Sequence, residues 1–293
     1  PRCDVLLNGS AYAPAGNWAK RVTVGLQVGR MAKSFHVVGD RIWQKGSVSI
    51  QASEPKPFKT MPITYDRAFG GVDDSYKDPQ KLRPFLANPI GVGYHHHLQA
   101  EFMDGKPLPN TEEISKPIII PNGNYRPMPF GPIGRGWQPR IPLAGTYDQN
   151  WVDNIFPFLP PDFDERYHQA APFDQQIDHP KGGERGFLTN LTPEGRTIFR
   201  LPTKRFLVWF FMKDDEEKET ESMIDTIMIE PDEKRFMVTW RTSLPLRRNI
   251  FEVEQAVIGE HPEDRYQQRE ENESLLLLTV AADEGVTQED GEA

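Results

Sequence analysis

The chain has 293 residues, of which 37% are hydrophobic, and it contains 27 prolines and 23 glycines. So many helix-breaking residues exclude a helical bundle and predict short elements joined by turns and long ordered loops. The formal net charge of −9 makes nucleic-acid binding unfavourable, because an acidic protein repels the phosphate backbone.

The number of cysteines and the length of the apolar runs indicate the cellular compartment of the protein. Cys3 is the single cysteine, so no internal disulfide can form, which fits a cytoplasmic protein. The longest apolar run, Ser274–Ala282, is shorter than the ~18–20 residues that span a bilayer, and no secretory signal is visible, so we predict no membrane association. The chain opens inside strand-like sequence at Cys3–Pro14, which indicates an N-terminal truncation.

The first fifty residues read as short β-type runs separated by glycine, with apolar alternation in Val22–Val28 and Ser34–Val38. Residues 51–182 are mostly irregular but rich in aromatic residues and isoleucine, so we expect ordered loops packed against sheets. One short helix is predicted at Asp148–Ile155, with Asp148 as its N-cap and Pro157 just beyond its end.

Strand patterns return from Gly183, and Asp225–Arg241 predicts a hairpin around a Pro-Asp turn. We therefore predict a mainly β protein in which antiparallel sheets from residues 1–50 and 183–258 pair across the middle into a sandwich-like body. Long ordered Pro/Gly-rich loops and little helix complete this single domain, residues 1–258. A polar acidic tail, residues 259–293, is predicted to hold an exposed helix after Pro262 and a disordered end.

Several long motifs occur in a fixed order. They are MPITYDRAFGG (Met61–Gly71), NPIGVGY (Asn88–Tyr94), LPN (Leu108–Asn110), FGPIGRGWQPR (Phe130–Arg140), AGTYDQNW (Ala144–Trp151), FPFLPPDFDERYHQAAPFDQ (Phe156–Gln175) and NLTPEG (Asn190–Gly195). This series resembles a bacterial domain-of-unknown-function family whose genes lie beside type VI secretion effectors and their spike proteins. The resemblance covers roughly residues 1–245. Members of that family usually begin with further β-type sequence, which agrees with a truncation here.

The resemblance implies an adaptor or co-chaperone. Such a protein holds a toxic effector, often with a second chaperone, until the effector is loaded on the valine-glycine-repeat spike or its PAAR tip. No catalytic residues come with the family, so the resemblance implies a protein that is not an enzyme and needs no cofactor. These partners and this role are expectations from the resemblance.

Three consecutive histidines, His95–His97, raise the possibility of a metal site. On a strand only His95 and His97 share a face, and Glu101 and Asp104 are the nearest carboxylates. Two ligands without a close cysteine or carboxylate partner do not make a zinc site. We therefore predict an exposed polar loop and no metal.

A cluster of carboxylates offers a different function. Asp162, Asp164, Glu165 and Asp174 could serve a hydrolase or a glycan-binding module. They could equally cap backbone amides or pair with Arg166, and the glycine and late glutamate of a calcium loop are missing. A secreted effector is a third interpretation, which the absence of nucleophile and metal-binding motifs opposes.

The stretch Arg126–Trp151 combines prolines, aromatics and arginines. Prolines fix the backbone in advance, and Trp, Tyr and Arg dominate binding hot spots, so this stretch predicts a preorganised, locally basic docking surface. The predicted partner-contact residues are Arg67, Phe69, Arg135, Trp137, Arg140, Tyr147 and Trp151. Alternatively, the stretch covers the core with Arg140 paired to Asp148 or to the Asp162 cluster, and Phe69 is itself in the core. Strand addition at a sheet edge is another possible docking mode, but the sequence does not identify the edge strand.

Overall fold

The computed structural model describes residues 2–47, 49–76, 78–247 and 249–259. The helix and disordered end predicted after Pro262 therefore lie outside the described residues. The chain divides into two compact units, where the sequence pattern indicated one β-rich domain over residues 1–258. Among the described residues, the first unit contains 2–203 and 224–239, and the second contains 204–223 and 240–259.

A five-stranded sheet forms one layer of the first unit. Its strands, in spatial order, are β12 (Thr111–Glu112), β4 (Met31–Val38), β3 (Arg21–Val28), β14 (Arg185–Thr189) and β15 (Arg196–Arg200). β3 alternates between exposed and buried residues, as its sequence predicts, so that one sheet face is apolar. β3 pairs antiparallel with β14 from the C-terminal half of the chain, which confirms the predicted pairing across the middle.

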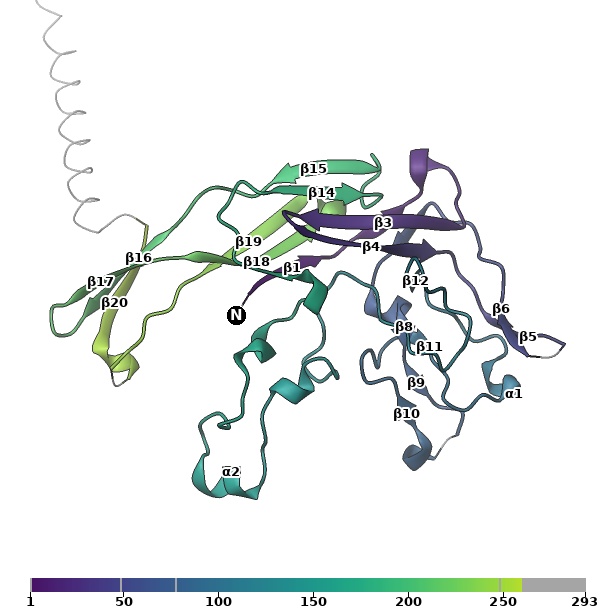
Figure 1. Ribbon diagram of the computed structural model, residues 1–293, viewed down its shortest axis with the longest axis horizontal. Coiled ribbons are helices and arrows are strands. Elements are labelled where there is room, and N and C mark those ends of the chain that lie inside the picture. The colour runs from purple at the N-terminus through teal and green to yellow at the C-terminus, as the bar shows by residue number, and fades with distance from the viewer. Residues whose placement is uncertain (1, 48, 77, 248, 260–293) are drawn as a thin grey trace, which may run out of the picture. The chain divides into compact units, whose positions relative to one another are not determined.

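A four-stranded sheet forms the second layer (Figure 1). Its strands, in spatial order, are β13 (Gln176–Ile177), β1 (Cys3–Leu7), β18 (Met223–Glu230) and β19 (Arg235–Arg241). Every residue of β1 is buried, because the strand lies in the middle of the sheet with both faces covered. β1 runs parallel to β18, which is an exception to the antiparallel pairing predicted for the sheets. More than 200 residues separate the two strands, so no hairpin imposes an antiparallel direction.

The predicted hairpin is confirmed between β18 and β19. The single 3-10 turn η7 (Pro231–Glu233) joins them, and Lys234 closes it in the left-handed region at φ 53°. Phe199 of β15 contacts Phe236 of β19, with ring centroids 5.7 Å apart, so the two layers meet at this end.

The middle of the chain packs as ordered loops around its own apolar cluster, as expected. Trp43, Phe69, Met103, Leu108, Ile118 and Tyr125 form the cluster. Short paired strands occur in this segment and in the first fifty residues: β2 (Ser10–Tyr12), β5 (Trp43–Lys45), β6 (Ile50–Ala52), β7 (Thr60–Pro62), β8 (Phe69–Gly70), β9 (Val72–Asp73), β10 (Arg83–Pro84) and β11 (Val92–Gly93). The pairs β2–β7, β5–β6 and β9–β10 are antiparallel, and β8–β11 is parallel.

A buried carboxylate ties this middle segment to the five-stranded sheet. Glu112 of β12 is 1% exposed and lies 3.2 Å from Arg41 and 3.1 Å from Arg21. The backbone N–H of Ile118 also donates to it at 3.1 Å. Burial lowers the pKa of Arg41, and Glu112 opposes that effect.

Helices are short throughout. They are α1 (Ala100–Met103), α2 (Gln149–Asn154) and the 3-10 turns η1 (Pro14–Gly16), η2 (Tyr65–Arg67), η3 (Pro79–Lys81), η4 (Ile141–Leu143), η5 (Glu165–His168), η6 (Phe173–Gln175) and η8 (Ile250–Glu252). Within the described part of the chain, none of these helices has the length and apolarity needed to cross a bilayer. The prediction of a mainly β protein with little helix is confirmed.

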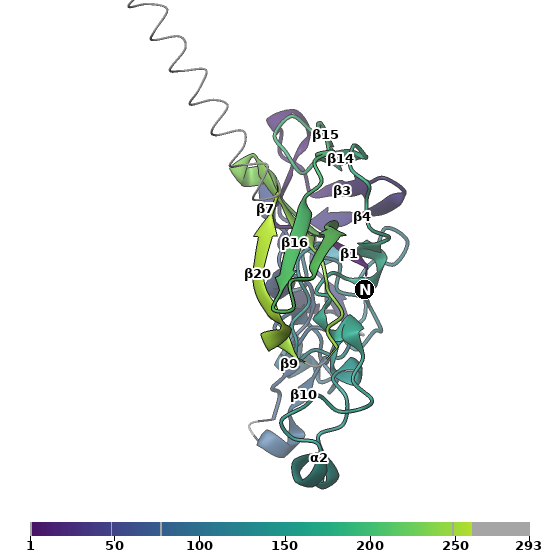
Figure 2. The same ribbon diagram turned by 90° about the vertical axis from the view of Figure 1, so that its left-hand side faces the viewer.

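The second unit contains a three-stranded antiparallel sheet. Its strands are β17 (Glu217–Glu221), β16 (Leu207–Met212) and β20 (Val253–Ile258), with β16 in the centre, and Figure 2 shows β16 beside β20. A capping box at Asn249 and Glu252 sets the η8 turn that leads into β20.

Candidate protein-docking surface

Residues 132–171 leave the sheets as one long loop, called here the projecting loop, with α2 at its far end (Figure 1). Its end carries a group of exposed apolar side chains, called here the apolar tip. The apolar tip consists of Tyr147, Val152, Phe156, Phe158 and Leu159, each more than half exposed. Phe158 is 75% exposed and Phe156 is 66% exposed, which is costly for aromatic side chains unless a partner covers them.

The apolar tip has a defined local structure. Asp148 caps α2 by accepting a hydrogen bond from the backbone N–H of Trp151 at 2.9 Å, as the sequence predicts. The indole N–H of Trp151 donates to the carbonyl of Phe158 at 2.9 Å. The Trp151 ring makes edge-on contacts with the rings of Tyr147 and Phe156, with centroids 4.8 and 5.5 Å apart. These contacts fix the exposed side chains relative to one another.

The charged residues in the sequence that carries the tip are all acidic. Residues 141–164 contain no lysine or arginine, and their four acidic residues are Asp148, Asp153, Asp162 and Asp164. A partner surface with apolar side chains and a basic rim would complement this arrangement.

Arg140 closes the base of the projecting loop. Its guanidinium is buried and donates to the carbonyl of Ile133 at 2.9 Å and, through Nε, to that of Tyr167 at 3.0 Å. It also lies over the Tyr167 ring, 5.2 Å from the centroid. Burial lowers the pKa of Arg140. This geometry corrects the alternative that Arg140 pairs with Asp148 or the Asp162 cluster, since carbonyl oxygens occupy its donors.

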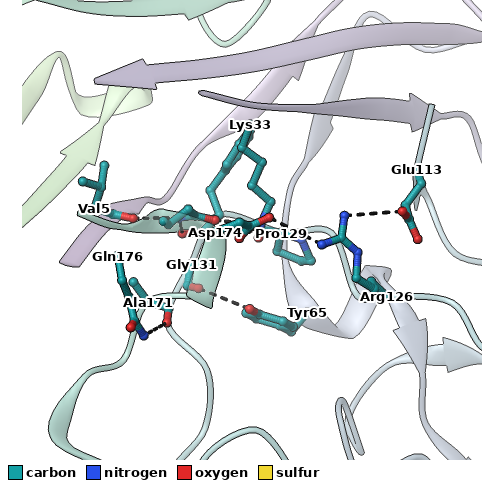
Figure 3. A network of polar contacts seen from close by, with 12 residues as sticks. Val5, Lys33, Tyr65, Glu113, Arg126, Pro129, Gly131, Ala171, Asp174 and Gln176 are labelled. Carbon is teal, nitrogen blue, oxygen red and sulfur yellow. Dashed lines mark hydrogen bonds and ion pairs between the residues drawn. The ribbon is translucent and has the colours of Figure 1, made fainter. Parts of the chain in front are cut away.

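Buried polar side chains anchor both ends of the projecting loop to the sheets (Figure 3). Lys33 of β4 donates to the carbonyl of Pro129 at 3.0 Å and to Gln175 Oε1 at 2.7 Å. Gln175, fully buried, donates in turn to the carbonyls of Val5 at 2.7 Å and Phe130 at 2.8 Å. One lysine and one glutamine therefore join β4, β1 and the two ends of the loop.

A second set of contacts supports the same base. Arg126 lies 3.3 Å from Glu113 and 3.8 Å from Asp174, and Asp174 lies 3.4 Å from Lys33 (Figure 3). The hydroxyl of Tyr65 donates to the carbonyl of Gly131 at 3.3 Å. The loop is thus held in advance of any binding event, which reduces the entropy that binding would cost.

The contribution of Lys33 to stability depends on pH. Burial lowers the pKa of Lys33 from 10.5 to about 8, although Asp174 acts in the opposite direction. Between these two values the unfolded chain binds the proton more tightly, so the contribution of Lys33 to stability rises as pH increases. We expect the free energy of unfolding of the natural chain, relative to Lys33→Met, to rise by about 2 kcal/mol between pH 7 and pH 10.

Urea unfolding at several pH values measures this difference. Lys56→Met is the matched control, because Lys56 is exposed and should give no such rise. A pH-independent difference for Lys33→Met would contradict the prediction.

The carboxylate cluster is engaged within the chain. Asp162 accepts from the backbone N–H of Thr146 at 3.0 Å and from its hydroxyl at 2.7 Å, and both bonds lower its pKa. Asp164 caps η5 and pairs with Arg166, which lowers the pKa of Asp164 to about 2. With Asp174 bound to Lys33 and Arg126, the cluster has the geometry of caps and ion pairs.

The histidine run does not form the expected exposed loop. His95 is 6% exposed, and burial lowers its pKa. His97 lies with Nδ1 3.0 Å from Asp73 Oδ2, and its backbone N–H donates to the same oxygen at 2.7 Å. Among the described residues, no three metal-binding side chains gather in one place.

The structure separates the predicted partner-contact residues. Phe69 is fully buried in the apolar cluster and Arg140 is buried at the loop base, so neither reaches the surface. Arg67 donates to Asn110 at 3.2 Å. Trp137 contacts the Tyr65 ring at 4.9 Å. Tyr147 belongs to the apolar tip, and Trp151 supports the tip through its ring contacts.

The predicted basic face is reduced by internal pairing. Arg126 is exposed but pairs with Glu113 and Asp174, and Arg140 is buried. Arg135 is the other exposed arginine of residues 126–147, and over the described part of the chain it has no ion pair. The sequence prediction also missed Phe156, Phe158 and Leu159. Their run FPFLPP places apolar side chains between prolines, where no strand or helix can bury them, and that is the signal that could have identified them.

The described residues thus define a β-rich protein with an anchored loop that exposes apolar side chains. The chain belongs to the family described as an uncharacterized protein conserved in bacteria (DUF2169), which matches residues 1–241. The membership in a bacterial family of this kind predicted from the sequence motifs is confirmed. No curated protein and no solved structure showed a significant match.

Proposed function

We propose that this protein is an adaptor that holds a protein partner through the apolar tip. The observation that carries the proposal is a set of aromatic side chains that are more than half exposed, yet fixed by the Asp148 cap and the Trp151 contacts. Fixed aromatic residues in a preorganised loop are typical of binding hot spots. The anchor through Lys33 and Gln175 supports the same role, because it holds the loop base rigid.

The identity of the partner rests on the motif resemblance. We propose a type VI secretion effector, alone or with a second chaperone, held until it is loaded on the valine-glycine-repeat spike or its PAAR tip. The role is proposed for the cytoplasm and uses no cofactor and no catalytic residue. The engaged carboxylates Asp162, Asp164 and Asp174 do not favour the hydrolase or glycan-binding alternative.

Substitution of the tip tests the proposal. Phe156→Asp with Phe158→Asp is expected to weaken capture of the effector encoded beside this gene by about a hundredfold, because two exposed anchors become charged. The free energy of unfolding should change little, since both side chains are solvent-exposed in the free protein. Pull-down with purified effector, followed by titration, measures the affinity.

The matched control is Ile119→Asp with Ile120→Asp, which changes two adjacent exposed apolar residues outside the projecting loop. This control should bind the effector normally. In cells, deletion of the gene should lower effector stability or export. Unchanged effector level and export in the deletion strain, or equal binding by the tip variant and the control, would refute the proposal.

A further inference from the structure

An apolar groove of about 610 Å³ opens at the end of the first unit where the two sheets meet. Ile198 and Phe199 of β15, Phe236 of β19 and Ile229 of β18 are among the residues that line it. Ile198 is 58% exposed and Phe236 is 39% exposed. The groove lies far along the sequence from the apolar tip and shares no residue with it.

β15 forms one wall of this groove and is the last strand of the five-stranded sheet (Figure 1). Over the residues that the structure describes, β14 is its one pairing strand. An uncovered strand edge offers backbone donors and acceptors to another polypeptide.

The hydrogen-bond register shows which backbone groups are available. The backbone N–H of Asn190 donates to the carbonyl of Gly195 at 2.6 Å, and that of Leu201 donates to the carbonyl of Glu184 at 3.0 Å. These opposite residues therefore form hydrogen-bonded pairs. Such pairs alternate along an antiparallel ladder, and the residues between them turn their N–H and C=O groups away from the partner strand. On β15 those residues are Arg196, Ile198 and Arg200, which pair opposite Thr189, Phe187 and Arg185.

The side chains beside this edge indicate the composition of its partner. Phe199 lies on the core face, where its ring covers Gly186, and it contributes an apolar wall to the groove. Ile198 lies on the opposite face, between the exposed Arg196 and Arg200. A strand added here would therefore meet apolar side chains on both faces and an arginine at each end.

The charged residues of the groove also favour a partner with acidic residues. The groove is lined by three basic residues, Arg196, Lys234 and Arg235, and by one acidic residue, Glu194. The groove is therefore locally basic, although the formal net charge of the chain is −9. Arg235 is neutralised by Glu230 at 2.7 Å, which leaves Arg196 and Lys234 to attract an acidic group.

We propose that the open edge of β15 binds an extended polypeptide segment as an added strand. The segment carries alternating apolar residues flanked by aspartate or glutamate. Backbone groups of Arg196, Ile198 and Arg200 supply the new ladder, the groove takes alternate apolar side chains, and the arginines pair with the acidic flanks. This site goes beyond the proposed function, because it is separate from the apolar tip.

Peptide selection on the full chain tests the site. A phage-displayed library of random nine-residue peptides is selected on the protein, and enriched peptides are synthesised and titrated. We expect alternating apolar sequences with acidic flanks. Hydrogen exchange should show that peptide binding protects the amides of Arg196, Ile198 and Arg200, since those amides point to the open edge.

Two substitutions separate strand addition from other binding. Ile198→Pro removes an outward N–H without removing a bond to β14, so the sheet should persist while peptide Kd rises at least tenfold. Arg196→Glu should raise Kd about fivefold for acid-flanked peptides. Arg30→Glu, an exposed change at the β3–β4 turn, is the control and should leave Kd unchanged.

The strand-docking proposal fails if no alternating sequence is enriched, if Ile198→Pro leaves Kd unchanged, or if the three amides gain no protection. Its failure is distinguishable from failure of the proposed function, which depends on effector capture by the Phe156 and Phe158 variant.

Discussion

Gln175→Leu is expected to lower the free energy of unfolding by about 3 kcal/mol, although the two side chains have similar volumes. The amide of Gln175 donates to the carbonyls of Val5 and Phe130 and accepts from Lys33. Leucine can make none of these bonds, so two buried carbonyls and one buried ammonium lose a partner. Phe130 keeps the N–H of Leu7 and Lys33 keeps the carbonyl of Pro129, so the loss is that of the three hydrogen bonds themselves. A neutral hydrogen bond contributes about 0.5–1.5 kcal/mol and one to a charged group about 1.5–3 kcal/mol.

Chemical denaturation of the purified chain measures this effect. Gln44→Leu is the matched control, because Gln44 is exposed on β5 and the same chemical change there removes no buried bond. We also expect the loop base to exchange its amide hydrogens faster in Gln175→Leu. A loss of stability no larger than that of the control would show that the anchor is not stabilising.

Glu112→Gln is expected to cost about 3–5 kcal/mol, because it leaves the Arg41 guanidinium as a buried charge without a counterion. Arg41 is 7% exposed, and its remaining bond is to the carbonyl of Pro109 at 3.0 Å. Glutamine has nearly the shape of glutamate, so the loss of stability would come from the missing charge and not from altered packing. The affected region is the middle segment that Glu112 ties to the five-stranded sheet.

Glu194→Gln provides the control, since Glu194 is exposed and the same substitution there should change stability little. The double variant Glu112→Gln with Arg41→Met should recover part of the loss, because it removes the uncompensated cation as well. A double variant that is less stable than the sum of the two single changes would argue against this explanation.

Local patterns predicted those parts of the fold that depend on neighbours in sequence. The alternation of β3, the cap of α2 by Asp148 and the β18–β19 hairpin each follow from a few adjacent residues. Parallel pairing of β1 with β18 was not predicted, although the uninterrupted apolar run at Val5–Leu7 is typical of a strand buried on both faces.

The candidate site was predicted less well, because its bonds join residues distant in sequence. Arg140 was considered as a partner contact or as an ion pair, but carbonyls of Ile133 and Tyr167 take its donors, and carbonyl positions are invisible in a sequence. Lys33 did leave a signal. It occupies an inward position of the alternating strand β4, where a charged residue needs a buried partner.

The central position of β1 has a consequence for biosynthesis. Its parallel neighbour β18 begins at Met223, so the ribosome must add more than 200 residues before that neighbour exists. At about 5–20 residues per second this interval lasts roughly 10–45 s. Until β13 is made at Gln176, the nascent chain holds an apolar strand with two open edges, and until β18 is made it holds one open edge. The four-stranded sheet therefore cannot form before synthesis has passed β18.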